Sequence, residues 1–176
     1  MIGTSDVLIH ELMVHPGVGE YGDTNYVAED TRAEFIEFYN RGTGTVPLAN
    51  WRISSGVSFV FPDVALAPGA HLVVAATEDV DWFRAHYRSD YPAVDQATVV
   101  GGWTGTLANN GEAVELQDAA GRTVDRLEYA TEGDWAERAT GDPYPGQPEW
   151  WRGWKWTTGA DAGGRSFELV NSRLPG

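Results

Sequence analysis

Residues 34–40 read Glu-Phe-Ile-Glu-Phe-Tyr-Asn, and this alternating, aromatic-rich run decides the fold class. Side chains of a β-strand point alternately to opposite faces, so the run predicts a strand with two distinct faces. Similar short runs recur along the chain. From them we expect further strands at residues 7–13, 51–54, 57–61, 70–76, 96–100, 113–117, 123–129 and 166–170.

Glycine and proline separate these runs, as is typical of turns. Residues 118–122 read Asp-Ala-Ala-Gly-Arg, and Gly121 can supply the positive φ of a hairpin turn. A helix is predicted only at about 79–87, with Asp79 as its N-cap. About nine short strands with one short helix predict an all-β protein, a β-sandwich forming one domain over residues 1–176.

The composition excludes several classes of protein. Asp and Glu total 26 against 12 Lys and Arg, giving a formal net charge of −14 that opposes broad contact with nucleic acid or anionic lipid. The absence of cysteine excludes disulfides, cysteine nucleophiles and thiolate metal sites. The apolar runs are too short for membrane insertion.

The start of the chain bears on its location. Residues 1–6, Met-Ile-Gly-Thr-Ser-Asp, lack the basic and apolar segments of a signal peptide. Two interpretations stay open: the protein is cytoplasmic, or it is a domain cut from a longer chain. The abrupt end at Gly176 fits the second.

Six segments match, in order, the strand motifs of one known family. Residues 34–40 are similar to its Glu-aromatic-Ile-Glu-Leu-Tyr-Asn strand, and residues 48–53, Leu-Ala-Asn-Trp-Arg-Ile, to its Leu-Ser-Gly-Trp-x-Leu strand. The other matching segments are 7–16, 61–74, 111–125 and 164–169. In these motifs the sequence resembles the lamin tail domain family, bacterial type, which implies an immunoglobulin-like β-sandwich.

Two features depart from the family pattern. His10 and Asn50 stand where the family usually has Asn and Gly, and residues from about 142 to 156 look like an insertion.

Strand parity and the resemblance together predict a core that includes Trp51, Phe59, Phe61, Leu72, Val74, Val114, Leu116 and Leu169.

The resemblance implies a fold more than a chemistry. In nuclear lamins this module contacts protein partners and DNA, and in bacteria it is an accessory domain of secreted or surface proteins. It is not known as a catalytic fold. The resemblance therefore implies a non-catalytic module that binds or positions other molecules. It also implies an extracellular or cell-surface location as part of a longer chain, with the cytoplasm as the alternative. The expected ligand is another protein domain, a cell-surface glycan or Ca²⁺.

Residues 10–15, His-Glu-Leu-Met-Val-His, are similar to a zinc-protease motif but fail its spacing. That motif places two histidines four positions apart on one face of a helix. Here the offset is five on a predicted strand, which puts His10 and His15 on opposite faces. We therefore expect no zinc site from this pair, and we interpret His71 and His86 as structural or exposed.

Two glutamates fall on apolar faces of predicted strands. Glu11 shares the strand parity of Val7, and Glu37 shares that of Phe35. A bare carboxylate on such a face is costly, so each acid needs a partner. One interpretation is structural: the partner is an arginine, such as Arg52 on the next strand, or a set of backbone N–H groups.

The other interpretation of these acids is a shared calcium site. Ca²⁺ takes six or more oxygen ligands, and residues 22–30 add acids and amides without a recognised loop spacing. Both interpretations stay open. The candidate metal ligands are Glu11, Glu34, Glu37, Asp23 and Asp30, with Asn25 as a further oxygen donor.

Four of the eight tryptophans lie in one octapeptide of the expected insertion, Glu-Trp-Trp-Arg-Gly-Trp-Lys-Trp. In an extended chain Trp150, Trp154 and Trp156 share a face, while Trp151 points the other way. Exposed, the rings would form a ligand-binding platform for sugars or an apolar partner, with Arg152 adding hydrogen bonds. Alternatively, they cover an open end of the sandwich and fill its core.

Two other function classes stay open. A sandwich-fold hydrolase or metal-dependent enzyme could use the plentiful carboxylates, but spacing identifies no nucleophile–base pair. Nucleic-acid binding, by analogy with the nuclear relatives, requires a basic face, and the arginines are scattered singly. We expect neither.

Overall fold

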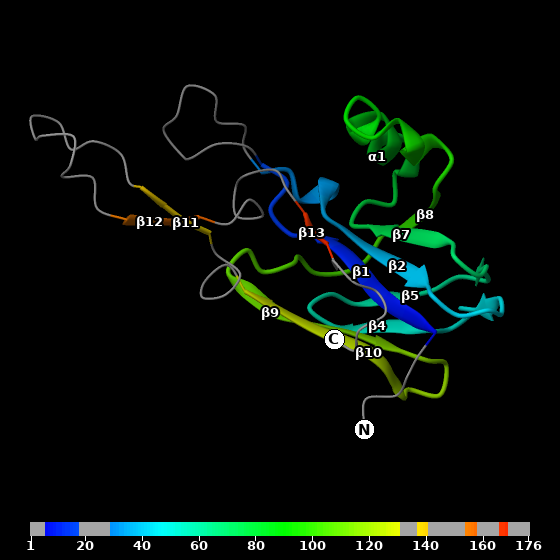
Figure 1. Cartoon of the computed structure of the whole chain (residues 1–176). Coiled ribbons are helices and arrows are strands. Elements are labelled where there is room, and N and C mark those ends of the chain that lie inside the picture. The colour runs from blue at the N-terminus through cyan, green and yellow to red at the C-terminus, as the bar shows by residue number, and fades with distance from the viewer. Residues whose placement is uncertain (1–5, 18–28, 131–136, 141–153, 158–165, 169–176) are drawn as a thin grey trace, which may run out of the picture.

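The computed structural model describes residues 6–17, 29–130, 137–140, 154–157 and 166–168 (Figure 1). The strands are β1 (Val7–Met13), β2 (Phe35–Asn40), β3 (Val46–Pro47), β4 (Arg52–Ser55), β5 (Phe59–Val60), β6 (Ala65–Leu66), β7 (His71–Ala75), β8 (Thr98–Gly101), β9 (Gly111–Gln117), β10 (Thr123–Ala130), β11 (Glu137–Thr140), β12 (Trp154–Thr157) and β13 (Phe167–Glu168). The helices are α1 (Val80–Tyr87) and the 3₁₀ turns η1 (Thr31–Ala33) and η2 (Pro92–Asp95).

Two sheets carry the fold. One has the strand order β13-β1-β2-β7-β8 and the other the order β10-β9-β4-β5. Every pair in them is antiparallel except β7 with β8, which is parallel. Two small pairs, β3 with β6 and β11 with β12, stand apart from these sheets. The predicted β-sandwich with one short helix is confirmed.

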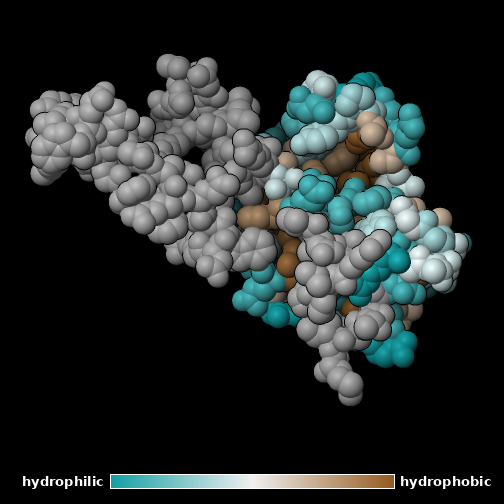
Figure 2. Space-filling model, viewed as in Figure 1, coloured by the Kyte–Doolittle hydropathy of each residue, from teal (hydrophilic) through white to brown (hydrophobic). Residues whose placement is uncertain are grey.

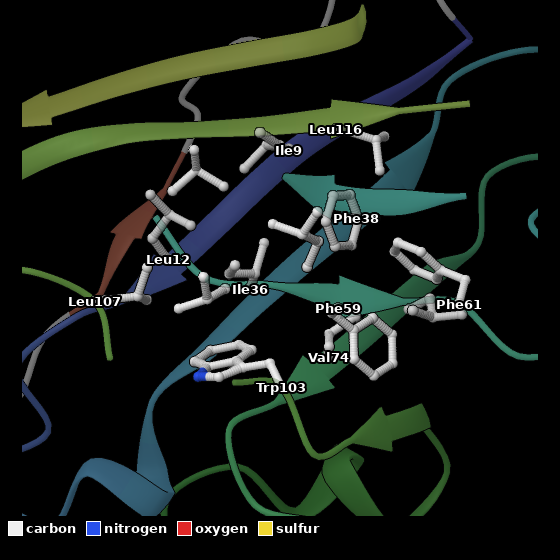
Figure 3. Packing of buried hydrophobic residues seen from close by; sticks show 14 of the residues in the cluster. Ile9, Leu12, Ile36, Phe38, Phe59, Phe61, Val74, Trp103, Leu107 and Leu116 are labelled. Atoms are coloured by element: carbon white, nitrogen blue, oxygen red, sulfur yellow. The ribbon is translucent and has the colours of Figure 1, made fainter. Parts of the chain in front are cut away.

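The core lies between the two sheets, where their inner side chains interdigitate (Figure 3). Phe38 of β2 meets Phe61 edge-on at a ring separation of 5.4 Å, and Phe59 meets Phe61 at 5.2 Å. The expected core residues within the described ranges all belong to this cluster, with Trp51 only partly buried at its margin. Leu169 lies outside the described residues.

Helix α1 has the bounds that the sequence predicts. The Asp79 side chain caps it by accepting a hydrogen bond from the Trp82 backbone N–H at 2.9 Å. Phe83 and Tyr87 face inward and form a second apolar cluster with Val73 and its neighbours on the outer face of the five-stranded sheet. One face of this sheet therefore packs on the sandwich core, and part of the other packs on α1. Among the described residues, no helix is long and apolar enough to cross a membrane.

Strand β1 contains a β-bulge, which corrects one prediction. Ile9 pairs with Phe38 and Glu11 with Glu37, so His10 is an extra residue in the ladder. Beyond the bulge the parity reverses. Leu12 enters the core, and Glu11 turns to the outer face. The prediction that Glu11 shares the face of Val7 is therefore wrong.

A backbone-to-carboxylate hydrogen bond connects the two sheets. The backbone N–H of Ile9 donates to a carboxylate oxygen of Asp125, on β10, at 2.8 Å. Ile9 is almost fully buried, so its N–H has no access to water if this acceptor is lost. Burial raises the pKa of Asp125, an effect that this bond opposes because it stabilises the charged form.

We expect Asp125→Ala to lower the free energy of unfolding by about 1.5–3 kcal/mol, because a buried N–H loses a charged acceptor. Urea unfolding followed by tryptophan fluorescence measures this. The control is Asp63→Ala, at an exposed position, which should stay within about 0.5 kcal/mol of the parent chain. Equal stability of the two variants would show that the hydrogen bond between Ile9 and Asp125 does not stabilise the fold.

Candidate functional site

Three polar side chains from adjacent strands meet on the outer face of the five-stranded sheet. They are His10 of β1, Glu37 of β2 and His71 of β7, and we name them the His–Glu cluster. One ligand atom from each residue lies within 4.8 Å of the other two. The bulge at His10 and the pairing of β2 with β7 bring these positions together.

Glu37 is the hub of this cluster. Its Oε1 atom lies 3.0 Å from Nδ1 of His10 and 2.7 Å from Nδ1 of His71. A carboxylate oxygen can accept both bonds when each imidazole carries its proton on Nδ1. Tyr39 packs against both rings, 5.6 Å from His10 and 4.6 Å from His71 between ring centroids, and restricts their rotation.

Glu11 lies beside the cluster, opposite Glu37 in the β1–β2 ladder. Its carboxylate accepts a hydrogen bond from the Ser166 hydroxyl, which comes directly before β13. Burial raises the pKa of Glu11, and the nearby charge of Glu37 raises it further. The structure thus brings together two of the five predicted metal ligands, Glu11 and Glu37.

A pocket of about 300 Å³ extends from these acids to α1. Its walls are largely aromatic, and its floor is the outer face of β2 and β7. Apolar side chains are visible in the hollow between α1 and the strands (Figure 2). The aromatic lining residues are Phe35, Phe83, Tyr87 and Tyr91, and the acidic lining residues are Glu11 and Glu37.

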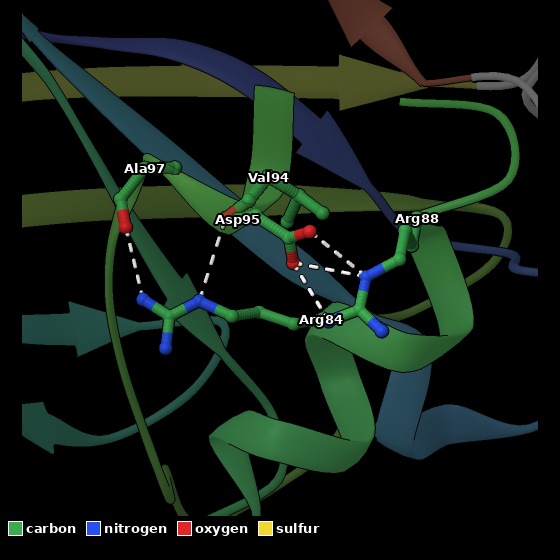
Figure 4. Close-up of polar contacts among 5 residues, drawn as sticks. All are labelled: Arg84, Arg88, Val94, Asp95 and Ala97. Carbon is green, nitrogen blue, oxygen red and sulfur yellow. Dashed lines mark hydrogen bonds and ion pairs between the residues drawn. The ribbon is translucent and has the colours of Figure 1, made fainter. Parts of the chain in front are cut away.

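Arg84 of α1 and Arg88, the C-cap residue that follows this helix, contact the far wall of this pocket (Figure 4). Arg84 donates from Nη2 to the carbonyl oxygen of Ala97 at 3.0 Å and from Nε to that of Val94 at 3.4 Å. Arg88 forms a two-pronged ion pair with Asp95 of η2, with an Nη2–Oδ1 distance of 2.8 Å. These contacts connect α1 and its C-cap to η2 and to the segment that leads into β8.

The structural interpretation names the wrong partner for Glu37. Arg52 lies in β4 of the other sheet, with its side chain exposed. The partners of Glu37 are His10 and His71. From the sequence, His10 is considered only together with His15 as part of a rejected zinc motif, and His71 is expected to be structural or exposed. The bulge and the pairing of β2 with β7 create this contact, and residue spacing reveals neither.

The other predicted ligands lie elsewhere or outside the described residues. Glu34 has the opposite parity to Glu37 and is fully buried, so it does not join that acid. Asp30 caps η1 and pairs with Arg32 at 2.6 Å. Asp23 and three of the five predicted platform residues, Trp150, Trp151 and Arg152, lie outside the described residues. The backbone of Trp154 and Trp156 forms part of β12.

Glu34 is the most deeply buried acid among the described residues. Its Oε2 accepts the backbone N–H of Leu107 at 3.0 Å, while its Oε1 has no hydrogen-bond partner in the part of the chain that the structure describes. Burial is the main cause that raises the pKa of Glu34, to about 8, and the charges of Glu29 and Glu112 add to it. At neutral pH this side chain is largely a neutral acid.

Comparison with known families agrees with the ordered strand motifs. The sequence profile of the Lamin Tail Domain family matches residues 2–131. The chain belongs to the lamin tail domain family. The matched part of this lamin tail domain includes the whole His–Glu cluster and the pocket, whereas residues 142–156 lie beyond it. No curated protein sequence matches the chain.

The raised pKa of Glu34 predicts a pH dependence of stability. A group with a higher pKa in the folded state stabilises the fold fully below its unfolded value of 4.5, and this contribution is lost as the pH rises to about 8. The loss is at most about 1.4 kcal/mol per pH unit. Glu34→Gln removes the titration. We therefore expect this variant to match the parent chain at pH 4 and to be more stable than it above pH 8.

Urea unfolding at both pH values measures this difference. Glu128→Gln, at an exposed position of β10, is the matched control and should show no pH-dependent difference from the parent chain. A constant difference between the Glu34 variant and the parent across this range would show that Glu34 does not titrate there.

Proposed function

We propose that this lamin tail domain is a non-catalytic binding module of a secreted or surface bacterial protein, and that it engages a partner protein through the pocket beside α1. The observation that carries the proposal is the combination of an aromatic-walled hollow with two acids at one end. We propose a basic side chain, Arg or Lys, as the group that enters it.

The lining favours a side chain that is apolar along its stem and positive at its tip. Phe35, Phe83 and Tyr87 offer ring faces and edges to an aliphatic stem. Glu11 and Glu37 offer carboxylate oxygens to the cation, and no Arg or Lys is among the described residues that line the pocket. A pocket of this size holds one such side chain, not an extended peptide.

The charge of the whole chain supports the same partner. A net charge of −14 attracts a basic surface over a distance of about 8–10 Å at physiological salt. This attraction raises the association rate more than the final affinity, which depends on the buried contacts. Affinity for the isolated side chain is therefore expected to be weak, and the full partner surface would add to it.

The proposal is tested with a pair of small probes. Nα-acetyl-arginine methylamide and its neutral analogue Nα-acetyl-citrulline methylamide have the same shape and differ in charge. We expect the arginine probe to shift the amide NMR signals of β2, β7 and α1 in the chelator-treated protein. The citrulline probe should produce much smaller shifts, because it lacks the charge that Glu37 stabilises.

Two variants locate the binding. Glu37→Gln should weaken the arginine probe at least about fivefold, and Ala93→Trp should block it by filling the pocket. Glu128→Gln removes an equal charge from an exposed position on β10 and should leave binding unchanged. Equal binding of the two probes, or shifts confined to other strands, would refute the proposal.

A further inference from the structure

We propose that the His–Glu cluster is a binding site for a divalent transition-metal ion of the zinc type. His10, Glu37 and His71 would supply two imidazole nitrogens and one carboxylate oxygen. The inference goes beyond the proposed binding of a basic side chain and does not depend on it.

The distances suit such an ion. In a tetrahedral zinc site with bonds of about 2.0–2.1 Å, neighbouring ligand atoms lie about 3.3 Å apart. Here Glu37 Oε1 lies 3.0 Å from the His10 nitrogen and 2.7 Å from the His71 nitrogen. The ligand atoms of His10 and His71 lie within 4.8 Å of each other. Rotation of the two imidazoles would therefore bring all three ligand atoms around one ion, with each neutral imidazole then carrying its proton on Nε2.

The backbone holds the three ligands in position. They lie on three neighbouring, hydrogen-bonded strands, which are stiffer supports than loops. The β-bulge at His10 directs that side chain to the outer face, a use of bulges that is common beside functional sites. Tyr39 packs on both imidazoles and reduces the number of rotamers that metal binding has to select.

The donor set favours zinc over calcium. Ca²⁺ requires six to eight oxygen ligands, whereas this cluster presents two nitrogens and the carboxylate of Glu37. Imidazole and carboxylate together are typical ligands of zinc and neighbouring metals. The calcium interpretation of Glu11 and Glu37 stays a prediction, and the same titration tests it.

The coordination would be incomplete with protein ligands alone. Three side chains leave a fourth tetrahedral position for water or an outside ligand. Glu37 and His71 both line the pocket beside α1, so this position faces the space in which a partner would insert. Bound Zn²⁺ would neutralise the charge of Glu37 and thus compete with a basic side chain.

The test is calorimetric titration of ZnCl₂ into the chelator-treated full chain, with CaCl₂ titrated in parallel. We expect one saturable zinc site and a rise in melting temperature with Zn²⁺. Substituted Co²⁺ should give visible d–d absorption bands of a four-coordinate site. His71→Ala should weaken zinc binding by at least about 100-fold, more than the loss of an outer-sphere partner usually costs.

His71 is a safe position for this variant because its side chain is 40% exposed. The matched control is His86→Ala, which removes an exposed histidine of α1 outside the cluster and should leave zinc affinity unchanged. Melting curves without metal show that both variants fold. Zinc affinity unaffected by His71→Ala, no saturable zinc site, or calcium binding in place of zinc would overturn the proposal.

The two proposals fail separately. The arginine-probe titration is carried out in chelator and reports only the pocket, whereas the zinc titration contains no probe. Zinc binding without binding of the arginine probe would support the metal site and refute the proposed binding of a basic side chain. The reverse result would leave the cluster as a hydrogen-bonded triad beside a pocket that binds cations.

Discussion

The register of β1 is the constraint on which both faces of the five-stranded sheet depend. A regular strand cannot place Val7, Ile9, Leu12 and Val14 in the same core, because its side chains alternate strictly. One extra residue at His10 reconciles the two halves. The core keeps three apolar side chains from β1 and a fourth from Val14, which follows the strand, while two consecutive polar residues, His10 and Glu11, point outward. The core packing and the polar cluster thus have a common origin.

The domain places several acids where water is scarce and stabilises each one differently. Asp125 stays bonded to the backbone of the opposite sheet, and Glu37 accepts from two imidazoles. Glu11 uses a hydroxyl donor, and Glu34 has a single N–H and is best accommodated as a neutral acid. The formal net charge of −14 counts every Asp and Glu as ionised, so it includes a negative charge that the buried Glu34 largely lacks at neutral pH. The buried acids serve to connect strands, and the exposed ones keep the surface hydrated.

Much of the architecture could be predicted from the sequence because the local residue patterns favour the same strands and helix that pack together in the fold. Short runs of β-type residues predicted β1, β2 and β7, and the Asp79 cap predicted α1. Sequence parity also placed Glu37 on the right face as an acid in need of a partner. The partners could not be predicted, because a bulge reverses parity without any local marker and strand order depends on contacts distant in sequence. The tryptophan platform lies largely outside the described residues and stays a prediction.

The parallel pairing of β7 with β8 has a consequence for how this scaffold could change. Parallel neighbours need a long crossover, and here residues 76–97 supply it, carrying α1 and η2. Most of the pocket's covering layer is therefore a single continuous segment that connects two adjacent strands. Replacing that segment would reshape the recess while leaving the sandwich strands untouched. The domain thus offers a natural grafting point for designing new specificities.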